Sequence, residues 1–295
     1  MCWTTRYEGI NRAAAPSSRV PCGGNSSAAA HASKNQRKTN MSFQTQARLD
    51  GKVVVITGGK GAIGFATALR LAALGARIIS INRQDQEAVQ VQLDTLPNAA
   101  MAKHFALTAS ITDSPSLVAA AKEVESRAGR CDVLINSAGF TKAIAPKDLD
   151  GLSDELFDSI MIANLRGVFA TIRSFSPLLK ASGDGLVVNV SSIAGFTGTG
   201  SNLAYVAAKA GLDVLTKSLA KALAPQVRVL AVSPGVVDST FVPDRGQDFN
   251  AKAAASIPLA RIGQVQDIAS AIEACATTLR FATGARFVID GGRSL

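Results

Sequence analysis

From residue 52 onward, short apolar runs rich in β-branched residues alternate with longer stretches rich in Ala and Leu. The short runs, which we expect to be strands, span residues 53–56, 77–81, 104–107, 133–135, 186–190, 227–232 and 286–289. The longer stretches have helical periodicity and span residues 63–74, 114–128, 153–179, 204–223 and 265–279. Strands separated by helices pair in parallel, and helices then cover both faces of the sheet. The pattern therefore predicts a single α/β domain with a doubly wound, seven-stranded parallel sheet.

Composition fits such a core and argues against several other classes of protein. Hydrophobic residues make up 47% of the 295 residues and aromatic residues only 5%, so the core is built from Ala, Val, Leu and Ile. No apolar run approaches the ~20 residues that a membrane-spanning helix needs, so no membrane association is expected. Four cysteines without disulfide or metal-site spacing favour a reduced, cytoplasmic protein. With only two histidines, no metal site is expected.

The segment before this domain is basic and has no hydrophobic periodicity. Residues 1–46 are rich in Ala, Ser, Asn, Gly and Arg, which predicts a disordered N-terminal extension ahead of a domain at 47–295. Residues 1–40 carry +5 of the net charge of +9, and the body has no basic stripe, so nucleic-acid binding is not expected. The extension resembles an organelle transit peptide, but Met41 would begin a compact domain naturally, and we favour a start there.

A glycine-rich loop follows the first predicted strand and leads into a helix. The run Thr57-Gly-Gly-Lys-Gly-Ala-Ile-Gly64 contains the spacing Gly59-x-Gly61-x-x-Gly64. Glycines let a pyrophosphate approach the backbone, and the helix N-terminus offers free N–H groups with a favourable dipole. A loop of this kind directly after the first strand of an alternating α/β chain indicates a Rossmann dinucleotide site.

The end of the second predicted strand is expected to contact the adenosine ribose. NAD-binding chains carry a carboxylate there, but this strand ends in Ser80-Ile-Asn-Arg83. Asn82 brings no negative charge, and the guanidinium of Arg83 could pair with a 2′-phosphate. We therefore predict NADP(H) over NAD(H). The alternative is that Arg83 is an ordinary solvated surface residue.

A tyrosine and a lysine stand four residues apart on a predicted helix. Tyr205 and Lys209 would share one helix face, and the positive neighbour would favour the phenolate. An unperturbed Tyr titrates near pKa ~10, so a lysine partner makes it more useful as an acid or base. Ser192 lies thirteen residues upstream of Tyr205, at the end of a predicted strand, with Ser191 as its rival. The strand alternation and the spacing favour Ser192.

With these motifs in place, the chain resembles the short-chain dehydrogenase/reductase family over about residues 48–295. Further segments in the family's order carry the resemblance: Asn136-Ser-Ala-Gly139, Asn164, Asn189-Val-Ser-Ser192, Pro234-Gly235 with Val237, and Asp290-Gly-Gly292. The chain departs from the usual pattern at Ala62, Ser110, Ser137 and Ser239. None of the four positions of the family's catalytic set departs.

The resemblance implies a role for each member of that set. Tyr205 donates a proton to the substrate oxygen, and Ser192 holds the same oxygen by a hydrogen bond. Lys209 lowers the pKa of Tyr205 and binds the nicotinamide ribose, and Asn164 holds a water that links Lys209 to solvent. The residues expected to bind the cofactor are Gly58, Lys60, Gly61, Ile63, Gly64, Asn82, Arg83, Asn136, Ala138, Gly139, Tyr205, Lys209, Pro234, Gly235, Val237 and Ser239.

The substrate side is less sharply defined by the sequence. The residues expected at the pocket edge are Phe140, Ile193, Ala194, Phe196, Asn202 and Phe241. The stretch 239–257 lacks a clear pattern and is predicted to be a mobile lid. The runs 195–205 and 48–52 are most similar to the 3-oxoacyl-thioester (acyl-carrier-protein) reductase branch, which implies ketone reduction. The family also implies a homotetramer, or else a dimer, packed through residues 168–179 and 207–223.

Two other functions stay open at this point. One is an NAD-dependent secondary-alcohol dehydrogenase, acting on a sugar or steroid in the oxidative direction. The other is a cofactor-binding regulatory protein on the same fold, which would be expected to lose the Tyr or the Lys, whereas this chain keeps both.

Overall fold

The computed structural model describes residues 48–243 and 248–295, so the predicted extension 1–46 lies outside the described residues. Seven parallel strands form one sheet in the order β3-β2-β1-β4-β5-β6-β7, which confirms the predicted fold class. The strands are β1 (Val53–Thr57), β2 (Arg77–Asn82), β3 (Phe105–Thr108), β4 (Val133–Asn136), β5 (Gly185–Val190), β6 (Val227–Pro234) and β7 (Arg286–Ile289).

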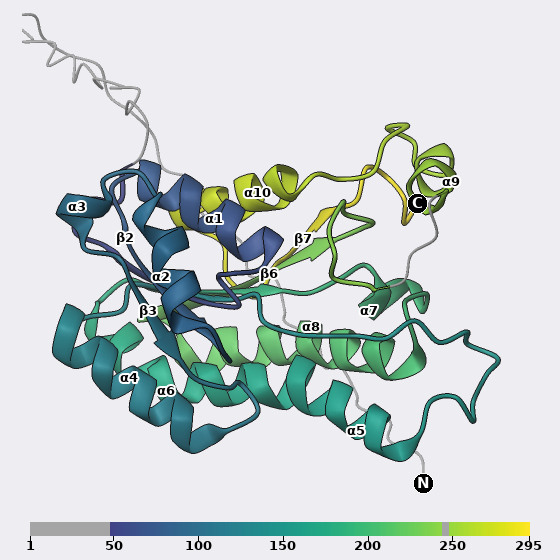
Figure 1. The fold of residues 1–295 in the computed structure, drawn as a ribbon, viewed down its shortest axis with the longest axis horizontal. Helices are drawn as coiled ribbons and strands as arrows, with labels where there is room; N and C mark the ends of the chain where they lie inside the picture. Colours follow the sequence, from purple (N-terminus) through teal and green to yellow (C-terminus); the bar gives the residue numbers. More distant parts are fainter. Residues whose placement is uncertain (1–47, 244–247) are drawn as a thin grey trace, which may run out of the picture. The chain divides into compact units, whose positions relative to one another are not determined.

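Helices cover both faces of this sheet (Figure 1). On one face lie α1 (Ala62–Ala73), α2 (Gln86–Asp94) and α10 (Val265–Thr277). On the other lie α4 (Ser114–Ala128), α6 (Gly167–Ala181) and α8 (Leu203–Leu223). The remaining helices are short: α3 (Ala99–Ala102), α5 (Asp154–Met161), the π-helical turn η1 (Ile162–Arg166), α7 (Ala194–Thr197) and α9 (Phe249–Ala255).

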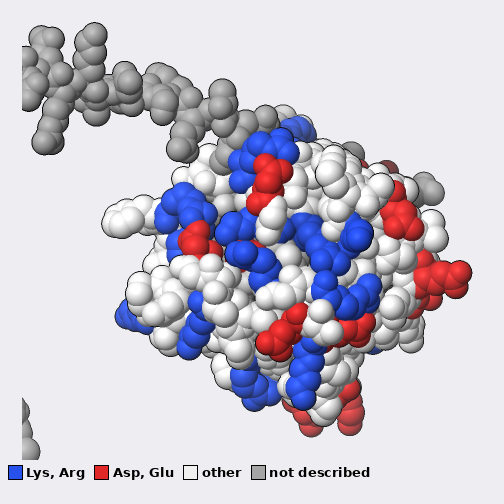
Figure 2. All heavy atoms as spheres, turned by 90° about the vertical axis from the view of Figure 1, so that its left-hand side faces the viewer, with Lys and Arg blue, Asp and Glu red and all other residues white. Residues whose placement is uncertain are grey.

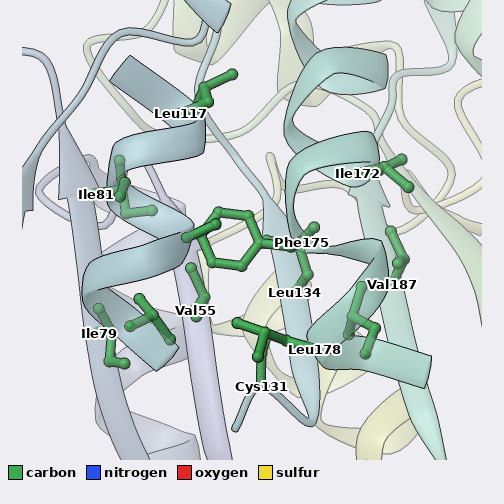
Figure 3. Packing of buried hydrophobic residues seen from close by; sticks show 14 of the residues in the cluster. Val55, Ile79, Ile81, Leu117, Cys131, Leu134, Ile172, Phe175, Leu178 and Val187 are labelled. Carbon is green, nitrogen blue, oxygen red and sulfur yellow. The ribbon is translucent and has the colours of Figure 1, made fainter. Parts of the chain in front are cut away.

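The period of two along each strand divides the core into two layers. In β1, Val53 and Val55 pack in the cluster under α4, α6 and α8, whereas Val54 and Ile56 pack in the cluster under α1, α2 and α10. Figure 3 shows the first layer, where the fully buried ring of Phe175 lies among side chains of β1, β2 and β4. Both faces of inner strands such as β1 and β4 are buried, which explains why the sequence shows continuous apolar runs there instead of alternation.

The strand order reverses beside β1 and thereby fixes the place of the site. The chain leaves β1 toward β2 and β3, then returns to pair β4 on the opposite side of β1. Open parallel sheets bind ligands in the crevice at the carboxyl ends of the strands, where the order reverses. The loops after β1, β4, β5 and β6 therefore face one crevice.

Several helices differ from the expectation. The single helix predicted at 153–179 is α5, η1 and α6 in succession, because a π-helical turn interrupts the α-helical hydrogen bonding at Ile162–Arg166. Helix α2 is short and largely polar, and α9 lies inside the stretch that lacked a pattern, so neither gave a clear apolar period. The lid predicted at 239–257 includes α9, and its residues 244–247 lie outside the described residues, so the lid stays a prediction.

The face at which the strands begin carries many Lys and Arg side chains, with Asp and Glu interleaved (Figure 2). At the start of β4, the buried carboxylate of Asp132 accepts hydrogen bonds from Lys52 Nζ at 3.0 Å and Arg130 Nη2 at 2.6 Å. Burial raises the pKa of Asp132, but hydrogen bonds from Arg130, the Val53 N–H and Lys52 outweigh it and lower this pKa. Within the described ranges, no helix is long and apolar enough to cross a membrane.

Candidate active site

Two adjoining cavities open at the carboxyl ends of the strands. The smaller, of about 180 Å³, lies against the glycine-rich loop after β1. The larger, of about 840 Å³, extends toward α7 and α9 and is called the cleft below. The two share Ser192, Tyr205, Gly235 and Phe241 in their linings. Two of the three reactive side chains singled out in the sequence therefore stand where the cavities meet.

Helix α8 positions the tyrosine through its first turn. Asn202 is the N-cap residue, and its Oδ1 accepts a hydrogen bond from the Tyr205 backbone N–H at 2.8 Å. The Asn202 amide donates in turn to Thr141 Oγ1 at 3.1 Å and to the Lys142 carbonyl at 2.8 Å. Capping satisfies a backbone donor that would otherwise lack a partner. It also ties the start of α8 to the loop after β4.

Lys209 follows Tyr205 by one helical turn, as the i,i+4 spacing predicts. Its Nζ lies 5.5 Å from the centroid of the Tyr205 ring and donates a hydrogen bond to the Val190 carbonyl at 2.8 Å. The side chain is buried, and burial lowers the pKa of Lys209 to about 8, although the negative charge of Asp213 acts in the opposite direction. The ammonium therefore still predominates at neutral pH beside the phenol.

Ser192 and Ser191 point in different directions at the end of β5. Ser191 is buried, and its hydroxyl donates to Asp213 Oδ1 at 2.7 Å. Ser192 is partly exposed and lines both cavities, and its Oγ accepts a hydrogen bond from the Ala194 N–H at 3.2 Å. The geometry supports Ser192, not Ser191, as the residue that meets a substrate oxygen.

Asn164 sits within the π-helical turn and is fully buried at the wall of the smaller cavity. Its amide donates to the Phe140 carbonyl at 2.8 Å and the Ile160 carbonyl at 3.0 Å. Its Oδ1 is buried and has no hydrogen-bond partner. A buried acceptor without a partner is costly, so this oxygen is a ready site for a water or ligand donor.

Comparison with known proteins gives the family. The short chain dehydrogenase family model matches residues 52–249. The chain is 33% identical over 249 residues to the 3-oxoacyl-(acyl-carrier-protein) reductase FabG of Thermotoga maritima, covering 83% of this chain and 98% of that protein. It is 32% identical over 243 residues to FabG of Staphylococcus aureus, covering 82% and 97% of the two chains. The chain belongs to the short-chain dehydrogenase/reductase family.

Solved structures of this family extend the comparison. Levodione reductase has a TM-score of 0.77 at 29% identity, with 84% of this chain and 99% of that chain covered. Aldohexose dehydrogenase of Thermoplasma acidophilum has a TM-score of 0.72 at 28% identity, with 83% and 95% covered. The chain is thus an oxidoreductase of the short-chain dehydrogenase/reductase family, acting on CH–OH or keto groups with a nicotinamide cofactor.

The glycine-rich loop fits such a cofactor. Gly58 has φ +70°, and a Cβ there would lie 2.9 Å from Ala138 Cα; a Cβ on Gly64 would lie 2.3 Å from the Gly58 carbonyl oxygen. Only glycine permits the tight packing of this loop against the loop after β4. The N-cap residue of α1 is Gly61, which has no side chain that could accept from the helix. The first N–H groups of α1 therefore remain available at the smaller cavity.

The residues expected at the adenosine ribose lie together at the end of β2. The Lys60 N–H donates to Asn82 Oδ1 at 3.0 Å, which ties the glycine-rich loop to β2. Lys60 Nζ pairs with Asp85 Oδ2 at 2.7 Å, an exposed ion pair. Arg83 is exposed and takes part in no ion pair among the described residues. Its guanidinium is thus the cation of this group that has no carboxylate partner.

Most of the sequence-predicted site residues come together around the smaller cavity. Those in its lining are Gly61, Ile63, Ala138, Gly139, Asn164, Ser192, Tyr205, Lys209, Pro234, Gly235, Val237, Ser239 and Phe241. Those outside it are Gly58, Lys60, Gly64, Asn82, Arg83 and Asn136. Asn136 is buried between strand ends, where its amide donates to Asn189 Oδ1 at 2.9 Å. Asn136 therefore joins the ends of β4 and β5 behind the cavity and does not line it.

The expected substrate residues divide in the same way. Ile193, Ala194 and Phe241 line the cleft. Phe140 and Asn202 line neither cavity. The Asn202 side chain caps α8, and Phe140 contributes only its backbone carbonyl, which accepts a hydrogen bond from Asn164. Phe196, also expected at the pocket edge, instead stacks under the Arg286 guanidinium at 3.9 Å.

Two residues beside the cavities, Asp213 and Arg293, were not predicted from the sequence. Asp213 accepts from Ser191 and, at 2.8 Å, from Arg286 Nη1. Because Asp213 follows Lys209 by four residues, helical spacing alone would have placed the two side chains on one face of α8. Arg293 lines the cleft, and nothing in the local sequence pattern points to it.

Proposed function

We propose that the protein is an NADP(H)-dependent reductase that transfers hydride between nicotinamide and the carbonyl of a 3-oxoacyl thioester or a similar ketone. The observation that carries this proposal is the meeting of the two cavities at Ser192 and Tyr205. A cofactor in the smaller cavity and a ketone in the cleft would both reach these side chains. The FabG relatives, named as 3-oxoacyl reductases, support the choice of ketone.

Ser192 and Tyr205 act on the substrate oxygen. When bound, the nicotinamide supplies the hydride or takes it up. The Ser192 hydroxyl donates a hydrogen bond to the carbonyl oxygen and stabilises the negative charge that develops there. The Tyr205 phenol gives its proton to the same oxygen in reduction and takes it back in oxidation. The ring of Phe241, with its centroid 6.0 Å from that of Tyr205, helps to hold the phenol in place.

Lys209 and Asn164 manage the proton behind Tyr205. The ammonium of Lys209, next to the Tyr205 ring, favours the phenolate left after proton transfer. It would also donate to the nicotinamide ribose. The unpartnered Oδ1 of Asn164 would hold a water that returns a proton to this pair. The two residues thus reset the site between turnovers.

Replacing Tyr205 by Phe tests the reaction. The ring stays and the proton is lost, so kcat/KM for ketone reduction should fall by about a hundredfold or more. The parent and the variant are compared by NADPH oxidation on acetoacetyl thioesters, β-ketoesters, sugars and quinones. Turnover of the variant near the parent level would contradict the assignment. Reduction of none of the ketones by the parent would contradict the function.

Arg83 is the proposed selector for NADP(H). Arg83→Gln removes a charged hydrogen bond to the 2′-phosphate, so kcat/KM for NADPH should fall by about tenfold. The value for NADH, which lacks that phosphate, should not fall and is the internal control. An equal loss with both cofactors would mean that Arg83 does not read the phosphate.

A sugar dehydrogenase working in the oxidative direction is the second candidate. The aldohexose dehydrogenase similarity favours it, and the hydroxyls of Thr197, Thr199 and Ser201 border the cleft. Oxidation of aldoses with NAD exceeding ketone reduction in the same panel would favour this candidate.

The same proposal includes the assembly and the compartment. We expect a homotetramer, with a dimer as the next alternative. We also expect a cytoplasmic enzyme, given the lack of any disulfide or metal-site spacing among its cysteines.

A further inference from the structure

The cleft contains a single cation and no carboxylate among the residues that the structure describes. Its lining is built mainly from small, apolar and hydroxyl side chains that follow β4, β5 and β6, and its one charged residue is Arg293, in the turn after β7. Arg293 is partly buried, and its guanidinium has no carboxylate within ion-pair distance among the described residues. A guanidinium at a cavity wall without a carboxylate partner keeps its charge and donors available to an anionic ligand.

The turn that carries Arg293 is held firmly. Asp290 Oδ1 accepts from the Gly292 N–H and its Oδ2 from the Ser294 N–H, both at 2.9 Å. Gly292 has φ +88°, and a Cβ there would lie 2.9 Å from Pro258 Cγ, so the turn packs closely against the chain after α9. The backbone of Arg293 is therefore fixed in position at the cleft.

The side chain of Arg293 is oriented as well. Its Nη1 donates to Ser256 Oγ at 2.6 Å. The Ser256 hydroxyl donates to the Ala253 carbonyl at 2.8 Å, which leaves its oxygen as the acceptor. One N–H of the guanidinium is used in this way, and the other donors remain for a ligand. A fixed guanidinium with spare donors is suited to a carboxylate or phosphate oxygen pair.

We infer that the substrates of this protein carry an anionic group, and that Arg293 binds this group in the cleft while the carbonyl meets Ser192 and Tyr205. The inference rests on the proposed function and adds the substrate class. The anion is either the carboxylate of a small oxo acid or a phosphate on the carrier arm of a thioester. Both present paired oxygens to a guanidinium, and the cleft, of about 840 Å³, is within the size range of small-molecule sites.

The test compares anionic and neutral substrates that share one carbonyl. Acetoacetate is paired with ethyl acetoacetate, and acetoacetyl-coenzyme A with acetoacetyl-N-acetylcysteamine, which lacks the phosphates. In Arg293→Met, kcat/KM should fall by about tenfold for one or both anionic substrates, mainly through KM, because the interaction is present in the ground state. For the neutral partners it should stay unchanged. The pair that responds identifies carboxylate or phosphate as the anion.

Two further variants sharpen the result. Arg293→Lys keeps the charge and loses the paired donors, so it should recover part of the loss. Lys147→Met removes an exposed cation next in sequence to cleft residue Pro146 but outside the lining, and should leave all four substrates unaffected. Equal losses for anionic and neutral substrates, no loss in Arg293→Met, or the same loss in Lys147→Met would overturn the inference.

A binding measurement separates this inference from the proposed function. Isothermal titration calorimetry of 3-hydroxybutyrate, its ethyl ester and coenzyme A needs no turnover. Weaker binding of an anion to Arg293→Met than to the parent supports the inference even if no ketone in the panel is reduced. If ketones are reduced but no anion binds more tightly to the parent than to this variant, the proposed function stands and the inference fails.

Discussion

Asp213 joins three elements around the Tyr205–Lys209 pair. It lies on α8 one turn beyond Lys209, accepts from Ser191 at the end of β5, and pairs with Arg286 at the start of β7. Its carboxylate is buried, so its charge acts through a medium less polarisable than water. That charge raises the pKa of Lys209 against the larger, opposing effect of burial. This aspartate therefore both holds the segment after β5, which carries Ser192, and raises the pKa of Lys209.

Asp213→Asn should move the alkaline limit of ketone reduction to lower pH. Without the negative charge, the pKa of Lys209 falls below its value of about 8, so the ammonium is lost earlier as pH rises. The alkaline limb of the pH profile should move by about one pH unit, as expected for one nearby charge. It is measured as kcat/KM for ketone reduction between pH 6 and pH 10.

Ser191→Ala is the matched control for this change. It removes the hydrogen bond to Asp213 Oδ1 but leaves the carboxylate charge in place. Its alkaline limb should therefore coincide with that of the parent, even if its overall rate is lower. A limb in Asp213→Asn that stays in place or moves to higher pH would show that Asp213 does not set the charge state of Lys209.

At the scale of elements, strands were more predictable than helix interruptions. A parallel strand buried on both faces is an apolar run in any context, and β1, buried at every position, spans Val53–Thr57 where a strand at 53–56 was expected. The π-helical turn at Ile162–Arg166 could not be foreseen, because a π turn changes hydrogen bonding without changing the apolar pattern. Asn164 was identified only by resemblance, and its orphaned Oδ1 depends on that turn.

Asn202→Ala tests whether the cap of α8 positions Tyr205. Loss of the cap and of two amide donors should lower the free energy of unfolding by about 2 kcal/mol. The rate should fall too, since the Tyr205 N–H is the group that the cap holds. Urea unfolding at one protein concentration and kcat for ketone reduction measure the two effects.

The comparison for this variant is the cap of another helix. Ser153 caps α5 by accepting from the Leu156 N–H at 3.4 Å. Ser153→Ala should lower stability but lower kcat less than Asn202→Ala does, because the N–H that Ser153 caps belongs to Leu156, whereas the N–H that Asn202 caps belongs to Tyr205. If Asn202→Ala has the parent's kcat, then the cap stabilises the helix without positioning the phenol.

At the scale of the molecule, the sequence was informative about the cofactor side and much less so about the substrate side. Glycines, a strand end and a tyrosine–lysine pair have fixed spacings that come from helix and strand geometry, so they can be read along one chain. The cleft is assembled from loops distant in sequence, including Arg293 near one end of the chain and Ile144 near its middle. No local period connects such residues, and Arg293 became visible only in three dimensions.

The proposed assembly depends on exposed apolar residues of α6 and α8. Phe169 on α6 is 39% exposed and Val214 on α8 is 63% exposed, on the two helices expected to pack between subunits. Burying such side chains against a second copy would remove apolar surface from water. Light scattering should therefore give the mass of four chains, or of two in the alternative assembly. Val214→Glu should lower that mass by placing a charge in the interface.

Val91 is the site of the control substitution for Val214→Glu. It lies on α2, on the other face of the sheet, and is 63% exposed like Val214. Val91→Glu introduces the same charge at the same exposure, so it should leave the mass of the parent assembly unchanged. A monomeric parent would contradict the assembly outright. A parent oligomer that resists Val214→Glu, or that Val91→Glu disrupts equally, would place the interface on a surface other than α8.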